Sequence, residues 1–227
     1  VLLLLKNDAE SDLFRNLETK APLTDVKDLL VTANAYLGAA PIAQALALGA
    51  DIVITGRVAD PSLTVGPCLY HYRWSENDYQ KIAGATIAGH LIECGTQATG
   101  GISTHWLSLP DKANIGFPVI EVYEDGSSVL TKPRGTGGEV SIRTTKEQLL
   151  YEIGDPARYL SPDATVSFLG LQLSEDGPDR VKIAGAIGSA PPSSYKVSAA
   201  YRGGFRCEAV LALAGPDVPE KAQACGA

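Results

Sequence analysis

The sequence contains no methionine, even at position 1, and it is poor in histidine and cysteine, with 3 His and 4 Cys among 227 residues. No two cysteines are close enough for a CxxC pair, so they indicate neither a disulfide scaffold nor a cysteine-rich zinc site. A reducing compartment is the simpler interpretation, and we expect a cytoplasmic protein. Because a translated start is missing, we also expect a processed chain or part of a longer one.

Long apolar runs and basic clusters are missing as well. The longest purely aliphatic run, Val1–Leu5, is far shorter than the ~20 residues that cross a bilayer. Lys and Arg number 19 against 26 Asp and Glu, which gives a net charge of −7. Membrane surfaces and nucleic acids are both bound through cationic patches, so we expect neither as a partner. Hydrophobic residues at 45% and charged residues at 20% exclude a disordered chain.

The first half has the pattern of a helix followed by a buried strand. Residues 39–48 are apolar and are followed by Gly49, which predicts a helix with a glycine C-cap. Two residues later the run Ile52–Thr55 is apolar throughout, as in a parallel strand covered on both faces. Only Val1–Leu5 offers a second strand in this half, and two strands cannot form a covered sheet. We therefore expect an oligomer, or a partner chain, that completes the sheet.

Three further helices are predicted in the first half. Asp60–Pro61 resembles an N-cap followed by proline at the first helical position, and predicts a helix to about Tyr72. Another helical stretch covers residues 76–94 and contains Gly84 and Gly89, where we expect close packing or a break. Residues 8–19 are expected to form a surface helix.

The second half has the pattern of short strands. Asp125–Gly126 between two apolar runs predicts a hairpin. Thr144 and Glu147 have the spacing of a capping box that opens a short helix to Ile153. Further strands are expected near residues 164–174, 180–186, 195–201 and 205–213, and a short helix from Asp217.

These elements predict an α/β fold class, with a parallel α/β unit in the first half followed by a mostly antiparallel, β-rich half. Residues 1–115 would form the α/β part, which is incomplete. Residues 116–227 would form the β-rich part with one short helix.

The first candidate site lies between the expected strand and the next helix. Thr55, Gly56, Arg57 and Asp60 are placed at the carboxyl end of that strand, where α/β sheets bind ligands. Free N–H groups of a helix N-terminus and the planar guanidinium of Arg57 would hold a carboxylate or phosphate. The alternative is structural, with Asp60 as a plain N-cap and Arg57 as its ion-pair partner.

The second candidate site is the end of the 76–94 helix with the glycine-rich loop that follows. Glu93 precedes Gly100 and Gly101, and a carboxylate in an apolar helix can act as a general acid or base. Cys94 is an alternative nucleophile with His90 or His105 as its base, but a helix C-terminus disfavours a thiolate. One His, one Glu and one Cys do not define a metal site, and a packed Cys94 is the favoured interpretation.

The third candidate site is the loop before Glu139. Gly135, Gly137 and Gly138 predict an anion-binding nest of backbone N–H groups, or a turn that requires positive φ. No Gly-Lys-Ser/Thr follows, and the spacing is not that of a dinucleotide fingerprint. Glu139 would complete an acid/base pair with Glu93 if the fold brings them together. We expect no cofactor and no metal.

The same stretches resemble the acyclic terpene utilisation (AtuA-like) protein family. The similarity covers nearly all of residues 31–225 and is carried by residues 33–39 (ANAYLGA), 49–60 (GADIVITGRVAD), 83–101 (AGATIAGHLIECGTQATGG), 135–140 (GTGGEV) and 149–157 (LLYEIGDPA). The resemblance implies longer relatives with an N-terminal α/β segment that is absent here. It also implies a link to the breakdown of citronellol- and geraniol-type terpenes, which proceeds through acyl-CoA intermediates.

Two functions are compatible with these residues and this resemblance. The first is an enzyme, a lyase, hydratase or hydrolase, acting by acid/base chemistry on a carboxylate or acyl-CoA-like substrate. Glu93 or Glu139 would move the proton, Arg57 would hold the anion, and the glycine loops would supply donors to a developing oxyanion. The alternative is a non-catalytic subunit or fragment of a larger complex.

Overall fold

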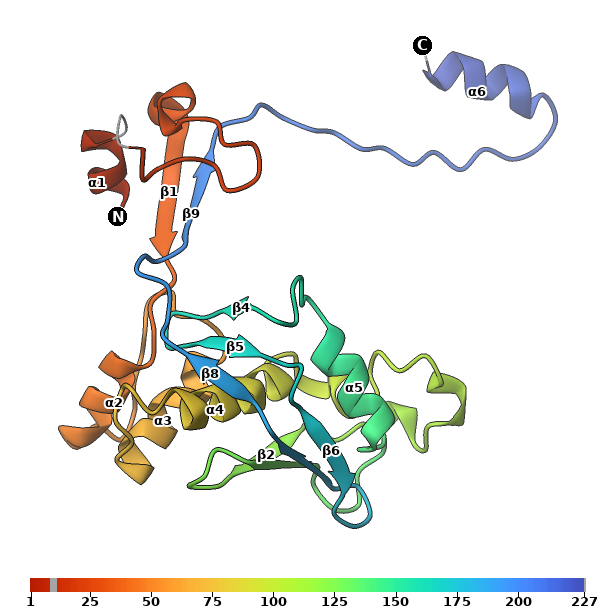
Figure 1. The fold of residues 1–227 in the computed structure, drawn as a ribbon. Helices are drawn as coiled ribbons and strands as arrows, with labels where there is room; N and C mark the ends of the chain where they lie inside the picture. The colour runs from red at the N-terminus through yellow and green to blue at the C-terminus, as the bar shows by residue number, and fades with distance from the viewer. Residues whose placement is uncertain (9–11, 227) are drawn as a thin grey trace. The chain divides into compact units, whose positions relative to one another are not determined.

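The computed structural model describes residues 1–8 and 12–226 and shows a mixed α/β fold (Figure 1). The chain forms two compact units. Residues 33–198, together with Val1, form the larger unit, whereas residues 2–32 and the chain from Ala199 onward form the smaller one. All the candidate site residues named above therefore belong to the larger unit.

Helix α4 (Tyr79–Ile92) is the core of the larger unit. Every residue from Ile82 to Leu91 is buried, so this stretch of the helix has no solvent-exposed face. The helix packs against α3 (Ser62–Tyr72), which in turn packs against α2 (Ala40–Ala47). Helix α5 (Ile142–Leu150) and strands of two sheets also contact α4.

Both sheets in contact with α4 are antiparallel. The four-stranded sheet has the order β2 (Val119–Val122), β3 (Ser128–Thr131), β7 (Val181–Ala184) and β6 (Gln172–Glu175). The three-stranded sheet has the order β4 (Tyr159–Leu160), β5 (Thr165–Ser167) and β8 (Ile187–Ser189). The predicted hairpin around Asp125–Gly126 is confirmed, with Ile120 of β2 opposite Leu130 of β3. Leu130, Val181 and Ile183 are buried in the core.

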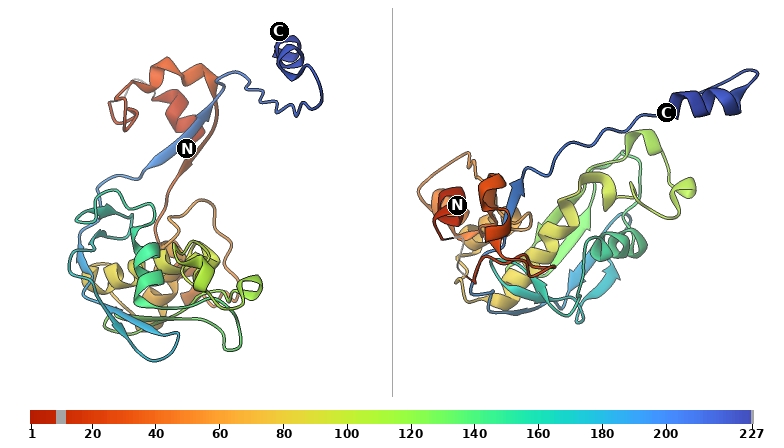
Figure 2. Two further views of the ribbon diagram at one scale, coloured as in Figure 1. Left: turned by 90° about the vertical axis from the view of Figure 1, so that its right-hand side faces the viewer. Right: turned by 90° about the horizontal axis from the view of Figure 1, so that it is seen from above.

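The smaller unit contains α1 (Leu2–Asn7), two 3₁₀ turns (Leu23–Asp25 and Lys27–Leu29) and α6 (Val218–Gly226). Strands β1 (Leu30–Ala35) and β9 (Val197–Tyr201) pair in a two-stranded sheet, and both strands continue into the larger unit. Residues 202–214, between β9 and α6, contain neither helix nor strand (Figure 2). No helix among the described residues has the length and apolar character needed to cross a membrane.

The glycines inside α4 mark close backbone contacts, as expected. A Cβ on Gly84 would lie 1.9 Å from the carbonyl oxygen of Gly126, in the hairpin turn. A Cβ on Gly89 would lie 2.7 Å from the Cα of Pro61, at the start of α3. Two glycines therefore let the hairpin and α3 approach the helix backbone, and this approach outweighs the loss of helix propensity.

The expected parallel strand Ile52–Thr55 is wrong. These residues lie in neither a helix nor a strand, and Ile52 and Ile54 are 81% and 91% exposed. In the described chain, the parallel pairings outside named strands are two isolated bridges, Leu37↔Val58 and Ile115↔Gly137. The residue pattern favours a strand, but a strand also needs a neighbour to accept and donate its backbone hydrogen bonds.

Other expectations about single elements are also corrected. Val1–Leu5 was expected as a strand, but Leu2–Asn7 is helix α1. Residues 205–213 were expected as a strand and have no partner strand. Within the expected 8–19 helix, residues 9–11 lie outside the described residues, and residues 12–19 form turns without a helix.

Two predicted helix starts are shifted. Helix α3 begins at Ser62, after Pro61, and no side chain caps it, so Asp60 is not its N-cap. Helix α5 begins three residues earlier than expected. Its capping box uses the Ser141 hydroxyl, which accepts from the Thr144 amide, while the Thr144 hydroxyl accepts from the Ser141 amide. Glu147 is therefore left free for another contact.

Candidate functional site

His90, in the last turn of α4, and Glu93, the residue that follows the helix, form a largely buried polar pair. The side chain of His90 is almost fully buried, and its Nδ1 lies 3.2 Å from Oε1 of Glu93. Its Nε2 lies 3.0 Å from the backbone carbonyl oxygen of Gln148 in α5. A carbonyl oxygen only accepts hydrogen bonds, so Nε2 must carry a hydrogen. Nδ1 is consequently the ring nitrogen that faces the Glu93 carboxylate, within hydrogen-bond distance.

Gln148 fixes the orientation of this pair. Its side chain is fully buried and donates from Nε2 to the carbonyl oxygen of His90 at 3.0 Å. Its Oε1 accepts from Nε2 of Gln97 at 3.2 Å. Together with the His90–Gln148 backbone contact, these bonds join α4 and α5 in both directions. The imidazole is further packed against the rings of Tyr159 and Phe168, with centroid distances of 6.3 and 6.1 Å.

Glu93 and two further carboxylates raise the pKa of two groups in this region. Burial raises the pKa of Tyr159 to about 12, and the charges of Glu93, Asp60 and Glu152 add to the rise. Burial also raises the pKa of the Cys94 thiol, and the same three carboxylates act in the same direction. The same three carboxylates therefore raise the pKa of one tyrosine and one thiol, and both groups remain protonated at neutral pH. A thiolate nucleophile at Cys94 is disfavoured on these grounds.

A groove of about 510 Å³ lies beside this network. Its lining is apolar, mainly Leu149, Ile153, Phe168 and Leu173, and includes one charged side chain, Lys146. The groove has the volume of an ordinary small-molecule site. Phe168 belongs to both places, because it lines the groove and its ring meets the His90 ring edge-on.

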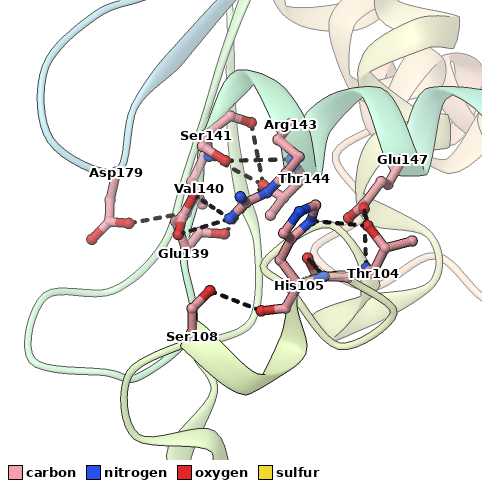
Figure 3. A network of polar contacts seen from close by, with 11 residues as sticks. Thr104, His105, Ser108, Glu139, Val140, Ser141, Arg143, Thr144, Glu147 and Asp179 are labelled. Carbon is pink, nitrogen blue, oxygen red and sulfur yellow. Dashed lines mark hydrogen bonds and ion pairs between the residues drawn. The ribbon is translucent and has the colours of Figure 1, made fainter.

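Glu139 belongs to a different network, on the other part of α5 (Figure 3). Its two carboxylate oxygens lie 3.3 Å from Nη2 of Arg143. No hydrogen bond or ion pair within residues 1–8 and 12–226 joins Glu139 to Glu93. The structure therefore does not bring the two glutamates into one acid/base pair by direct contact.

The network of Figure 3 continues through Glu147. The Thr104 hydroxyl donates to Oε1 of Glu147 at 2.7 Å, and Nδ1 of His105 lies 3.1 Å from that hydroxyl oxygen. Burial alone would raise the pKa of Glu147, but hydrogen bonds from Thr104 and Ser103, with the charge of Arg143, hold it below its usual value. Nδ1 of His105, a candidate base for Cys94, is thus in contact with Thr104, and no hydrogen bond among the described residues joins His105 to Cys94.

The glycine loops hold their N–H groups in backbone hydrogen bonds. Gly137 donates to the carbonyl of Asn114 and Gly138 to that of Pro110, at 2.8 and 2.9 Å. The amides of Gly100 and Gly101 donate to Gln97 and Thr96. The expected anion-binding nest is therefore not formed by these four amides. Gly135 has φ +76° and open space around its Cβ position, as in a turn that requires glycine.

Comparison with known sequences identifies the chain. The sequence profile described as "Acyclic terpene utilisation family protein AtuA" matches residues 2–227. The chain belongs to this family. No curated protein and no solved structure matches it.

The family membership confirms the resemblance seen in the sequence, and the structure shows how the AtuA segments meet. Residues 83–101 supply His90, Glu93 and Cys94, while residues 149–157 contain the last two residues of α5 and the turn that follows it. Residues 49–60 end at Asp60, one of the three acids around Tyr159. Thr55 is half-buried, and Gly56 and Arg57 are exposed.

Sequence reasoning missed three buried or half-buried polar residues that join separate elements of this region. Gln148 and Tyr159 lie 58 and 69 positions after His90, so no local spacing links them to it. Asp163 was also missed, although it joins α2 and α3. Its Oδ1 accepts from the Ala39 amide at 2.6 Å and its Oδ2 from the Ser62 hydroxyl at 2.5 Å, and burial raises its pKa. These residues become visible only when separate elements are packed together.

Proposed function

We propose that this AtuA-family chain is an enzyme that performs acid/base chemistry on a carboxylate or acyl-thioester substrate. One observation carries the proposal: Nδ1 of His90 lies 3.2 Å from Oε1 of Glu93, while the other imidazole nitrogen is committed to the Gln148 carbonyl. Glu93, which is 14% exposed, is the member of the pair that can reach a substrate. His90 is buried and acts as a positioning residue that holds the proton behind it.

Hydration, dehydration and hydrolysis are the reaction types that suit this pair. In each direction a group must take a proton from water, or return one to a leaving hydroxyl or to carbon. The Glu93 carboxylate takes the proton, and the His90 ring shares it until it is returned. The protonated hydroxyl of Tyr159 supplies a nearby neutral donor, since its pKa of about 12 keeps it from ionising at neutral pH.

The apolar groove supports a substrate with an aliphatic portion. Its leucine and isoleucine side chains would contact hydrocarbon, and Lys146 would contact an anionic group at its edge. Phe168 connects this groove to the His90 ring, so a chain held there lies near the proton-transfer pair. The family description, acyclic terpene utilisation, is consistent with a branched aliphatic substrate.

Replacement of Glu93 by glutamine is expected to reduce turnover by about 100-fold or more, because the amide cannot exchange the proton. The assay measures hydration of a panel of branched α,β-unsaturated acyl-CoA thioesters. The reaction is monitored through the loss of absorbance of the conjugated enoyl group. Hydrolysis of the same thioesters is followed by thiol release.

The matched control for this test is Glu152→Gln, which removes a carboxylate from the same surroundings without touching His90. Its turnover is expected to stay within about tenfold of wild type, because only a remote charge is lost. Equal turnover of Glu93→Gln and wild type on every active thioester would contradict the proposal. So would equal losses in both variants, which would indicate a general field effect.

A second candidate function, as a component of a larger assembly, is favoured by the Ile52–Thr55 segment. Within the described chain, no backbone–backbone hydrogen bond involves residues 51–56. The side chains of Ile52 and Ile54 are almost fully exposed. We propose that a second copy or another chain pairs with this segment and buries both side chains.

Sedimentation velocity over a range of concentrations tests this assembly. We expect the wild-type chain to associate, and the double variant Ile52→Thr with Ile54→Thr to shift towards monomer, because apolar burial drives the contact. Leu107→Thr, which also removes an exposed apolar side chain, serves as the control and should associate like wild type. A wild-type monomer at every concentration, alone and with cell extract, would overturn the idea.

A further inference from the structure

Three segments that are distant in the sequence meet at Tyr36. The amide of Tyr36 donates to the carbonyl of Lys196 at 3.0 Å, just before β9. The next residue, Leu37, donates to the carbonyl of Arg57 at 3.3 Å and accepts from Ala59 at 2.9 Å. Backbone hydrogen bonds thus hold both the Arg57 segment and the Lys196 segment against residues 36–37.

The side chains at this junction form a cationic cluster on an aromatic ring. The guanidinium carbon of Arg57 lies 5.6 Å from the centre of the Tyr36 ring, and Nζ of Lys196 lies 5.8 Å from it. Both distances are within the range of cation–π contacts. Two like charges therefore contact one ring, in a protein whose net charge is −7.

Neither cation has an acidic partner. Among the residues that the structure describes, no ion pair involves Arg57 or Lys196. Both side chains are exposed and make no hydrogen bond to another described residue. Two unpaired cations on a fixed ring repel each other, and an anion bound between them relieves that repulsion.

We propose that Arg57, Lys196 and Tyr36 bind a phosphate group of the substrate. A phosphate monoester carries about −1.5 to −2 charges at pH 7 and matches two cations, whereas a carboxylate carries one and is satisfied by Arg57 alone. The Arg57 guanidinium donates N–H hydrogen bonds to two phosphate oxygens, and Lys196 adds a point charge from the neighbouring segment. Contact with the Tyr36 ring restrains both long side chains, which lowers the entropy lost when the anion binds.

The inference rests on the proposed function only in calling the phosphate part of the substrate. The segment that carries Arg57 also carries Asp60, whose charge acts on Tyr159 together with that of Glu93. A phosphate held at Arg57 is thus a handle remote from the reacting atoms, and its binding energy positions the substrate. Phosphate binding is measured without turnover, so the two proposals fail separately.

Isothermal titration of the full chain with inorganic phosphate, pyrophosphate and acetate at low ionic strength tests the site. We expect wild type to bind pyrophosphate and phosphate more tightly than acetate. Arg57→Gln and Lys196→Gln should each weaken pyrophosphate binding by about tenfold, because each loses one charge-assisted contact. Added salt should weaken binding, as it does for any exposed charge pair.

Three controls make the result specific. Lys182→Gln removes an exposed cation of the larger unit that contacts no ring, and should change pyrophosphate binding less than about twofold. Tyr36→Phe keeps the ring and should keep binding, whereas Tyr36→Leu should weaken it severalfold. Glu93→Gln should bind pyrophosphate like wild type even where its turnover is lost.

Equal losses in Lys182→Gln and Arg57→Gln would overturn the proposal, because they would show only a general charge effect. Acetate bound as tightly as pyrophosphate would also overturn it and indicate a carboxylate site. No measurable binding of either phosphate probe to the folded wild type would do the same. Circular dichroism of each variant distinguishes lost binding from lost structure.

Discussion

Replacing Gly84 by alanine is expected to destabilise the protein by about 3 kcal/mol, or to prevent folding, although alanine is the better helix former. A Cβ at this position would lie 1.9 Å from the carbonyl oxygen of Gly126 and 2.7 Å from its carbonyl carbon. Both atoms are backbone atoms of the hairpin turn, where Gly126 has φ +85°, so neither can rotate away. The helix and the hairpin would have to separate, exposing part of the buried core.

Urea unfolding of Gly84→Ala and of Gly154→Ala provides the measurement. Gly154 has no positive φ and no atom within 4 Å of its Cβ position, so its substitution should change the free energy of unfolding by no more than about 0.5 kcal/mol. A Gly84→Ala protein as stable as wild type would show that α4 and the hairpin do not touch in solution. A protein that does not accumulate in folded form agrees with the expected direction.

Replacing Asp179 by asparagine is expected to destabilise the protein by about 3 kcal/mol at pH 7. Nζ of Lys132 lies 3.0 Å from Oδ2 of Asp179, and the Lys132 side chain is only 5% exposed. The amide leaves the buried ammonium without its counter-charge, with the Thr136 carbonyl as its remaining described partner. Asp179 has φ +53°, a conformation that asparagine also tolerates, so the substitution isolates the charge from backbone strain.

The free energies of unfolding of Asp179→Asn and Asp12→Asn are to be compared under the same conditions. Asp12 pairs with Arg15 on the surface, where the side chains are 85% and 49% exposed, and such a pair contributes about 0–1 kcal/mol. The double variant Lys132→Met with Asp179→Asn should recover much of the loss, because it removes the unpaired buried charge. Equal effects of the two single aspartate variants would show that Lys132 is not buried in solution.

The sequence by itself determined the elements whose signals are local. The helix after Ala39 ends where Gly49 takes φ +89°, and the hairpin turns at Gly126 with φ +85°. Helix α4 lies within the predicted stretch, and α6 lies within the predicted tail. Period, glycine position and turn residues decide these features within a few residues of chain, so no distant partner is needed.

Only the tertiary structure decided which apolar segments become strands. Ile52–Thr55 has a strong strand sequence but lacks a neighbour, whereas Val119–Val122 has one in β3. A strand is stabilised by hydrogen bonds and cross-strand side chains from other segments, which a local pattern does not contain. The same reason explains why residues 205–213 form no strand in this chain.

The candidate site divides in the same way. Glu93 was predicted from its place at the end of an apolar helix, and Arg57 from its place before the next one. The partners of these residues come from other elements. Gln148 contacts the His90–Glu93 pair, and Lys196 contacts the same ring as Arg57. Hydrogen bonds and cation–π contacts depend on distances of a few ångströms between such elements, and only packing sets those distances.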